Sequence, residues 1–170
     1  MIKFQVKIVV AFTFLIFSIL FGSTKTVAQQ KTQQVRIYLC CYFDYDPNDS
    51  KNIFGLSPVL RSVSASAPLR GALEALLAGP TIAEEAKGIT TSTSGVKLAS
   101  VNIKNGTAYT YFTQPSGTGF PGDMAPSRFR DAVERTAKQF SSVKKVIICL
   151  DGILNFDDES ERTITCRRRK

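Results

Sequence analysis

The sequence from residue 35 to 152 predicts an α+β domain, a two-layer sandwich in which a four-stranded, mainly antiparallel sheet carries two helices on one face. Apolar and polar residues alternate over 35–42, and apolar residues recur at helical spacing over 68–78 and 127–140. Asn105-Gly106 separates two extended segments, as in a tight hairpin. The resulting order, strand–helix–strand–strand–helix–strand, fits two helices packed on one sheet.

The first strand is expected over residues 35–42, where alternate residues from Val35 to Cys41 share one face. Residues 56–63 are ambiguous and are interpreted as a short extended piece. The first helix follows over 68–78, where Leu69, Ala72, Leu73, Leu76 and Leu77 form one apolar face. Pro68 suits the first helical position, and Gly79 followed by Pro80 suits the helix end.

The next strand is expected over residues 96–103, with a bulge near Ser100 because the apolar phase shifts between Leu98 and Val101. The return strand, 107–112, directs Ala108, Thr110 and Phe112 inward. A second helix over 127–140 and a last strand over 146–150 complete the domain, and residues 81–95 and 114–126 are expected to be loops.

Residues 1–28 have the features of a secretory signal peptide: Lys3 and Lys7, then a predominantly apolar run from Ile8 to Gly22, then Thr26-Val27-Ala28. The apolar run is shorter than the roughly 20 residues that span a membrane, although an uncleaved membrane anchor stays the alternative. The sequence therefore predicts an exported protein that is periplasmic, extracellular or membrane-associated on the outer face.

The remaining chain divides into a flexible lead-in, 29–34, the domain, 35–152, and a charged C-terminal tail, 153–170. The formal net charge of +8 is concentrated at the two ends, and Arg167 to Lys170 form the basic end of the tail. Nucleic acid is not an expected partner, because no basic stripe is interleaved with aromatic residues along the chain.

Four cysteines in an exported chain indicate disulfides, with three pairings open. Cys40 and Cys149 lie off the core phase of the first and last strands, which would be antiparallel neighbours in a split βαβ sheet. A Cys40–Cys149 disulfide is therefore our hypothesis. The chain has no His and no Cys-x-x-Cys pair, which argues against a zinc site.

Catalytic and metal sites have little support in the sequence. A Ser–His–Asp arrangement is excluded because there is no His, and a Cys nucleophile would have no His partner. Asp44, Asp46 and Asn48 have calcium-loop spacing, but Asp49 and Gly55 occupy the positions that require Gly and Glu. We expect no catalytic residue, no metal and no cofactor.

The loop 114–126 is the best candidate for a contact surface, because long Gly/Pro loops on a rigid scaffold often carry function. Phe120 lies at its centre, and Arg128 and Arg130 follow just beyond it. A plain connector is the competing interpretation.

Three stretches together resemble the GerMN domain family of sporulation and spore germination. Pro68–Thr81 resembles its first helix, Val96–Ala108 its hairpin, and 136–152 its second helix and final strand ending in Asp151-Gly152. The sequence departs from the family where Tyr111 precedes Phe112, a position that often holds Asp, and in its cysteines. The resemblance implies an envelope domain, often tethered to a membrane, with no established catalytic residues.

The function expected from these observations is a non-catalytic cell-envelope module that contacts an envelope protein or peptidoglycan. Two alternatives stay open: a hydrolase of cell-wall metabolism, and a homo-oligomer that assembles into a ring or scaffold.

Overall fold

The computed structural model describes residues 31–41, 54–93, 95–116, 118–157 and 163–166. Three features predicted from the sequence lie outside these ranges: the signal peptide, the calcium-loop spacing of Asp44, Asp46 and Asn48, and the basic end of the tail. Across the ranges described, no helix is long and apolar enough to cross a membrane.

The first sheet has the order β2-β1-β3. β1 (Thr32–Cys41) pairs antiparallel with β2 (Leu56–Ser64) along nearly its whole length. The short β3 (Ile89–Thr90) joins the end of β1 at Cys40 and Cys41. β1 starts at residue 32, so the last three residues of the expected lead-in belong to a strand, paired with the end of β2.

The second sheet has the order β4-β5-β6. β4 (Lys97–Lys104) and β5 (Thr107–Thr113) form the predicted hairpin, in which Asn105 and Gly106 adopt φ values of 51° and 73°. These positive φ values are the ones a tight hairpin turn requires. The predicted bulge is confirmed, because the β4–β5 register shifts between Leu98 and Ser100.

β6 (Lys145–Leu150) pairs with β5, and the pairing is parallel. The helix α4 (Ala125–Lys138) connects these two strands and returns the chain to the same end of the sheet. Such a crossover gives a parallel pair, whereas a short turn gives an antiparallel one.

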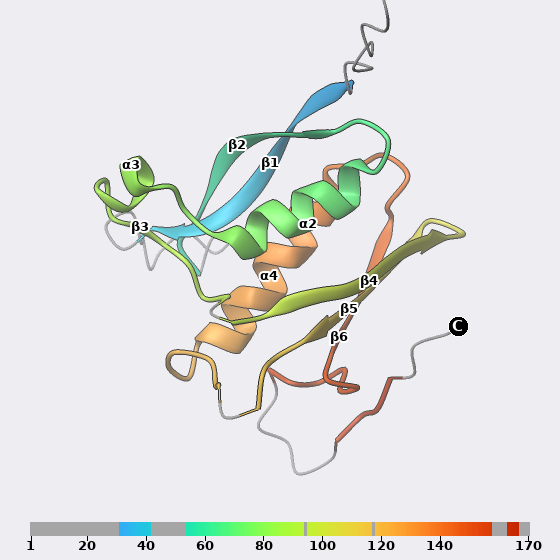
Figure 1. Cartoon of the computed structure of the whole chain (residues 1–170). Helices are drawn as coiled ribbons and strands as arrows, with labels where there is room; N and C mark the ends of the chain where they lie inside the picture. Colours follow the sequence, from blue (N-terminus) through green and yellow to red (C-terminus); the bar gives the residue numbers. More distant parts are fainter. Residues whose placement is uncertain (1–30, 42–53, 94, 117, 158–162, 167–170) are drawn as a thin grey trace, which may run out of the picture. The chain divides into compact units, whose positions relative to one another are not determined.

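The two long helices lie between the two sheets (Figure 1). α2 (Pro68–Ala78) contacts β1, β2 and β4, whereas α4 contacts β1 and β6, and the helices also contact each other. The side chains at this junction are fully buried: Ile37, Leu39, Leu73, Leu76, Phe112, Phe129, Val133 and Ile148. Each helix therefore needs apolar residues toward both sheets.

The α+β class is confirmed, but the expected single four-stranded sheet is not found. Residues 56–64 form a full strand, and this strand occupies the edge of β1 that the last strand was expected to take. The last strand instead pairs with β5 in the other sheet. The two sheets therefore form because residues 56–64, which are ambiguous in the sequence, are a strand that pairs with β1.

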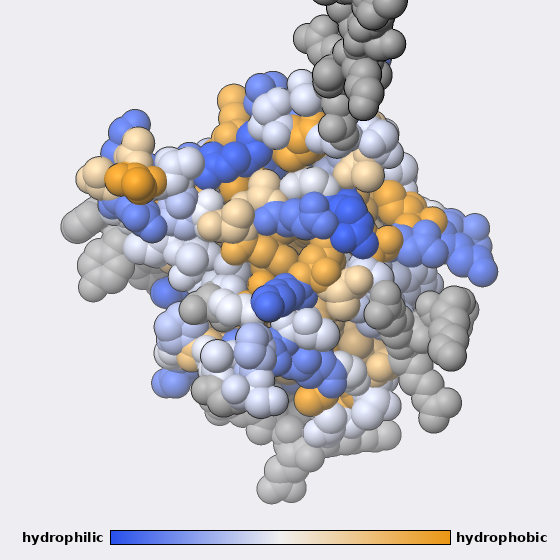
Figure 2. Space-filling model, in the orientation of Figure 1, coloured by the Kyte–Doolittle hydropathy of each residue, from blue (hydrophilic) through white to orange (hydrophobic). Residues whose placement is uncertain are grey.

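The expected loop 81–95 contains a short helix, α3 (Ile82–Glu85), as well as β3. Thr81 and Glu84 form a capping box: the Glu84 N–H donates to the Thr81 hydroxyl, and the Thr81 N–H donates to the Glu84 carboxylate. In the view of Figure 2 one apolar area lies over α3, where Ile82 is 86% exposed.

Candidate functional site

The predicted contact residues Phe120 and Arg130 lie together against the C-terminal segment. The Phe120 ring packs on the core ring of Phe129, at 5.6 Å between centroids, and stacks on Phe156 at 6.3 Å. Phe120 is thus partly used to anchor the loop to the core. Arg128 is half-buried next to this cluster in sequence, and its Nε has no hydrogen-bond partner among the described residues.

Arg130 connects α4 to the segment that follows β6. Its Nε donates to Asp157 Oδ2 at 2.5 Å, and its Nη2 donates to the carbonyl oxygen of Leu154. The guanidinium carbon lies 4.6 Å from the centre of the Phe156 ring, which is a cation–π distance. Arg130 therefore has a structural role in holding residues 154–157 on the helix.

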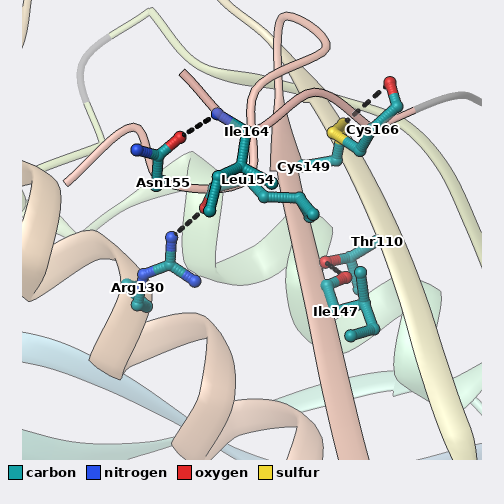
Figure 3. The surroundings of a disulfide bond; sticks show 8 residues. All are labelled: Thr110, Arg130, Ile147, Cys149, Leu154, Asn155, Ile164 and Cys166. Atoms are coloured by element: carbon teal, nitrogen blue, oxygen red, sulfur yellow. Dashed lines mark hydrogen bonds between the residues drawn. A yellow bond between two sulfur atoms is a disulfide. The ribbon is translucent and has the colours of Figure 1, made fainter. Parts of the chain in front are cut away.

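A disulfide closes the same segment from its other end, and it joins Cys149 to Cys166 (Figure 3). The expected Cys40–Cys149 bond is therefore wrong, and Cys40 keeps a free thiol. The physical reason is the sheet topology: Cys40 lies on β1 in one sheet and Cys149 on β6 in the other.

The chain between the two disulfide cysteines folds back on itself where the structure describes it. Ile153 bridges both Leu150 and Thr165, and the Leu154 N–H donates to the Ile164 carbonyl at 2.8 Å. The Asn155 side chain accepts the Ile164 N–H at 2.7 Å (Figure 3). This part of the expected charged tail is therefore attached to the domain.

Two hollows flank β4 and β5. The first, which we call the β4 groove, has a volume of about 320 Å³ and runs between the start of α2 and the side of β4. Its apolar lining comes from Leu69, Val101, Ile103 and Phe140, and Arg70 and Ser142 add polar groups. Ile103 is 39% exposed, so an apolar side chain faces solvent at this groove.

The second hollow, which we call the disulfide pocket, has a volume of about 330 Å³. It lies between Tyr111 of β5 and the residues around Cys166. The Cys166 N–H donates to the Gly152 carbonyl at 2.7 Å, and this bond together with the disulfide fixes one wall. Asp151 also lines the pocket, and its carboxylate accepts the Gln114 N–H at 3.2 Å.

Among the described carboxylates, the one with the most perturbed pKa is Glu84, which lines neither hollow. The Arg61 guanidinium donates to both oxygens of Glu84, at 2.7 and 2.5 Å, and this pairing with the Thr81 N–H bond lowers the pKa of Glu84 to about 2. The same pair raises the pKa of Arg61. A depressed carboxyl pKa is the signature of a structural ion pair rather than of a general acid.

The sequence predicted Phe120 and Arg130 as contact residues, but it did not predict which residues they contact. No sequence signal pointed to Phe156 or to the Cys149–Cys166 bond, because both depend on how the segment after β6 returns to the domain. The sequence did predict that Ala108, Thr110 and Phe112 point inward. Because side chains alternate along a strand, Tyr109 and Tyr111 must then point away from the helices.

Most of the chain matches one family model. The family model "Germane: Sporulation and spore germination" matches residues 40–154, about two thirds of the chain. The chain belongs to the Germane family. The match covers every described element from the end of β1 to the segment after β6.

One solved structure supports the same fold. The tandem GerMN domains of the sporulation protein GerM from Bacillus subtilis match with a TM-score of 0.53 and 17% identity, over 85% of this chain and 49% of that one. This Germane chain therefore spans about half the length of that tandem structure. The first GerMN domain of the same protein matches with a TM-score of 0.46 and 22% identity, over 71% of this chain and 84% of that one. Among curated proteins, none matches this chain.

Proposed function

We propose that this Germane chain is an exported, non-catalytic module of the bacterial cell envelope that binds a protein partner along the edge of β4. The Germane description, sporulation and spore germination, supports a role in one of these two processes. The structural nature of the Arg61–Glu84 pair fits a non-catalytic domain, because its carboxylate stays ionised and bound.

The observation that carries the proposal is the β4 groove beside a sheet edge. Among the described strands, β4 pairs with β5 alone, so its other edge offers backbone hydrogen-bonding groups. In a hairpin with a two-residue turn, the residues that flank the turn bond to each other, and the bonded pairs alternate from there. Lys104 is such a flanking residue, so Val101 and Ile103 direct their backbone groups outward.

An extended partner segment would hydrogen-bond to Val101 and Ile103 and place alternate side chains in the β4 groove. This is the strand-addition mode of recognition, in which the backbone gives affinity and the pocket gives specificity. The apolar walls from Leu69 and Phe140 favour an apolar side chain in the partner.

In-cell photo-crosslinking tests this function. A photoreactive residue at Ile103, in the full chain expressed in its own host, is expected to form an adduct with an envelope protein. Val101→Pro should abolish that adduct, because proline removes an outward N–H while leaving the β4–β5 bonds intact. The matched control is a photoreactive residue at Ser62, an exposed position on the edge strand of the other sheet, where no adduct is expected.

Two results would contradict the proposal. An adduct of twice the mass of the chain would favour the self-assembling scaffold, and release of muropeptides from peptidoglycan by the purified chain would favour the hydrolase.

A further inference from the structure

The open edge of β4 differs from the edges of the first sheet. In β2, Pro58 has no backbone N–H, and the Leu60 carbonyl accepts the Arg61 guanidinium at 3.0 Å. In β1, both backbone groups of Arg36 bond to the side chain of Gln139. β4 contains no proline, and among the described residues no side chain bonds to its backbone. An added strand would therefore find free backbone groups at β4.

A strand added at this edge would place every second side chain on the groove side of the sheet. Val101 and Ile103 line the β4 groove, and they lie opposite Thr110 and Ala108, which are buried toward the helices. Because side chains alternate between the two faces of a strand, the partner residues beside Val101 and Ile103 enter the groove. Two apolar residues with one residue between them therefore fit there.

The residues that flank this apolar pair would lie on the opposite face of the sheet, which is basic along β4. Lys97 and Lys104, at the two ends of the strand, are exposed and share this face with Thr113 and Thr107, their cross-strand neighbours. β4, β5 and β6 contain no Asp or Glu. Among the described residues, no ion pair holds either lysine. An added strand therefore meets a positive charge near each of its ends.

The hairpin end of the edge carries further basic residues. The N–H groups of Lys144 and Lys145 both donate to the Gly106 carbonyl, at 2.7 and 3.1 Å, and both side chains are exposed. A Cβ atom at Gly106 would lie 3.3 Å from Lys144 Cγ, so this side chain lies against the turn. Among the described residues that line the β4 groove, Arg70 alone is charged. In Figure 2 the hydrophilic tip of this hairpin lies beside an apolar area.

We propose, on the basis of the strand-addition function above, that the partner segment is acidic: two apolar residues one position apart, with Glu or Asp on each side of them. The apolar residues occupy the groove beside Val101 and Ile103, and the flanking carboxylates lie on the other face, near Lys104 and Lys97. Opposite charges on neighbouring strands stabilise a pairing, and like charges destabilise it. The pattern is the same in both chain directions, so it applies to a parallel and to an antiparallel partner strand.

Peptide binding to the full, disulfide-intact chain tests this sequence preference. The acidic peptide is Thr-Glu-Val-Thr-Val-Glu-Thr, blocked at both ends and fluorescently labelled. The basic peptide has Lys in place of both Glu, and the polar peptide has Thr in place of both Val. Fluorescence anisotropy is measured in about 0.15 M salt, where distant charges are screened. We expect the acidic peptide to bind about tenfold more tightly than the basic one and about fivefold more tightly than the polar one.

Charge reversal in the chain separates this pairing from misfolding and from general attraction. Lys104→Glu should weaken binding of the acidic peptide about fivefold and strengthen binding of the basic peptide by a similar factor. A misfolded variant would weaken both, so opposite changes are specific to the pairing. The matched control Lys87→Glu makes the same change at an exposed position outside the strands and should alter both affinities by less than about twofold.

The outcomes distinguish this inference from the function on which it rests. Equal binding of the acidic and basic peptides, lost for both in Val101→Pro, would overturn the acidic preference and leave strand addition in place. Equal effects of Lys104→Glu and Lys87→Glu, or no binding of the acidic peptide at millimolar concentration, would overturn the preference as well. Binding of the acidic peptide that survives Val101→Pro would contradict strand addition itself, and with it this inference, because no backbone pairing would then be needed.

Discussion

The side-chain amide of Gln139 makes two hydrogen bonds to the backbone of Arg36 in β1, as a neighbouring strand would. The Arg36 N–H donates to Gln139 Oε1 at 2.8 Å, and Gln139 Nε2 donates to the Arg36 carbonyl at 2.6 Å. The two residues are 103 positions apart in sequence. Gln139 follows the last turn of α4, so this pair of bonds attaches the helix end to the edge of the first sheet.

Replacing Gln139 by Glu should therefore destabilise the domain by about 1 kcal/mol, because a carboxylate cannot donate to the Arg36 carbonyl. Urea unfolding measures the difference. Gln139→Lys would lose the acceptor instead and should cost a similar amount. If both variants unfold at the same urea concentration as the unmodified protein, the two bonds contribute nothing.

The Arg61–Glu84 pair predicts a specific dependence of stability on pH. The pKa of Glu84 is lowered from 4.5 to about 2 in the folded chain, so the stabilisation is complete above about pH 4.5 and is lost as the pH falls toward 2. We expect about 1 kcal/mol, since the pair is partly exposed to solvent. Unfolding curves between pH 6 and pH 2 check this.

Glu84→Gln is the appropriate variant for this pair, because Gln retains the capping box with Thr81 and loses only the charge. The variant should be less stable than the unmodified chain at pH 6 and indistinguishable from it near pH 2. Glu85→Gln, one residue away and outside the Arg61 pair, is the control and should follow the unmodified curve.

The Cys149–Cys166 bond should supply a large part of the stability of the segment after β6. Its two cysteines are 17 residues apart, and closing a loop of that size stabilises a fold by about 3 kcal/mol. Cys166→Ser should lower the free energy of unfolding by about this amount, whereas Cys40→Ser should change it little. Peptide mapping without reduction should recover Cys149 linked to Cys166, and a Cys40 linkage would contradict the assignment.

A close approach between α2 and β2 makes Gly71 hard to replace. A Cβ atom at this position would lie 2.8 Å from the Cβ of Val63. Gly71→Ala should therefore cost about 1 to 3 kcal/mol through overpacking, despite the better helix propensity of Ala. Thermal unfolding measures the loss, and Gly119→Ala, whose Cβ would meet nothing within 4 Å, should be close to neutral.

Local patterns predicted the elements whose causes are local. Pro68 and Gly79 delimited the first helix, which spans residues 68–78 as expected. Asn105-Gly106 predicted the hairpin because both residues accept positive φ. The helix 127–140 is observed two residues earlier at each end, as Ala125–Lys138. Thr81 and Glu84 have the capping-box spacing, which is the local pattern that starts α3.

The candidate sites were less accessible to sequence reasoning. Phe120 and Arg130 could be selected from the loop composition, but their packing on Phe156 and Asp157 required the segment after β6 to fold back. The parallel pairing of β6 with β5 places Lys145 in the same row as Lys104, on the other side of Thr107. Neither arrangement can be predicted from the spacing of residues along the chain.

The sequence by itself determined the family, the α+β class, the hairpin and the two helices, because turn residues and apolar spacing act within a few residues. Tertiary structure alone decided which strands became neighbours and which cysteines bonded. Strand neighbours and disulfide pairing depend on which distant segments reach the same sheet edge. The observed arrangement is the one that buries the apolar residues of α2 and α4 against both sheets.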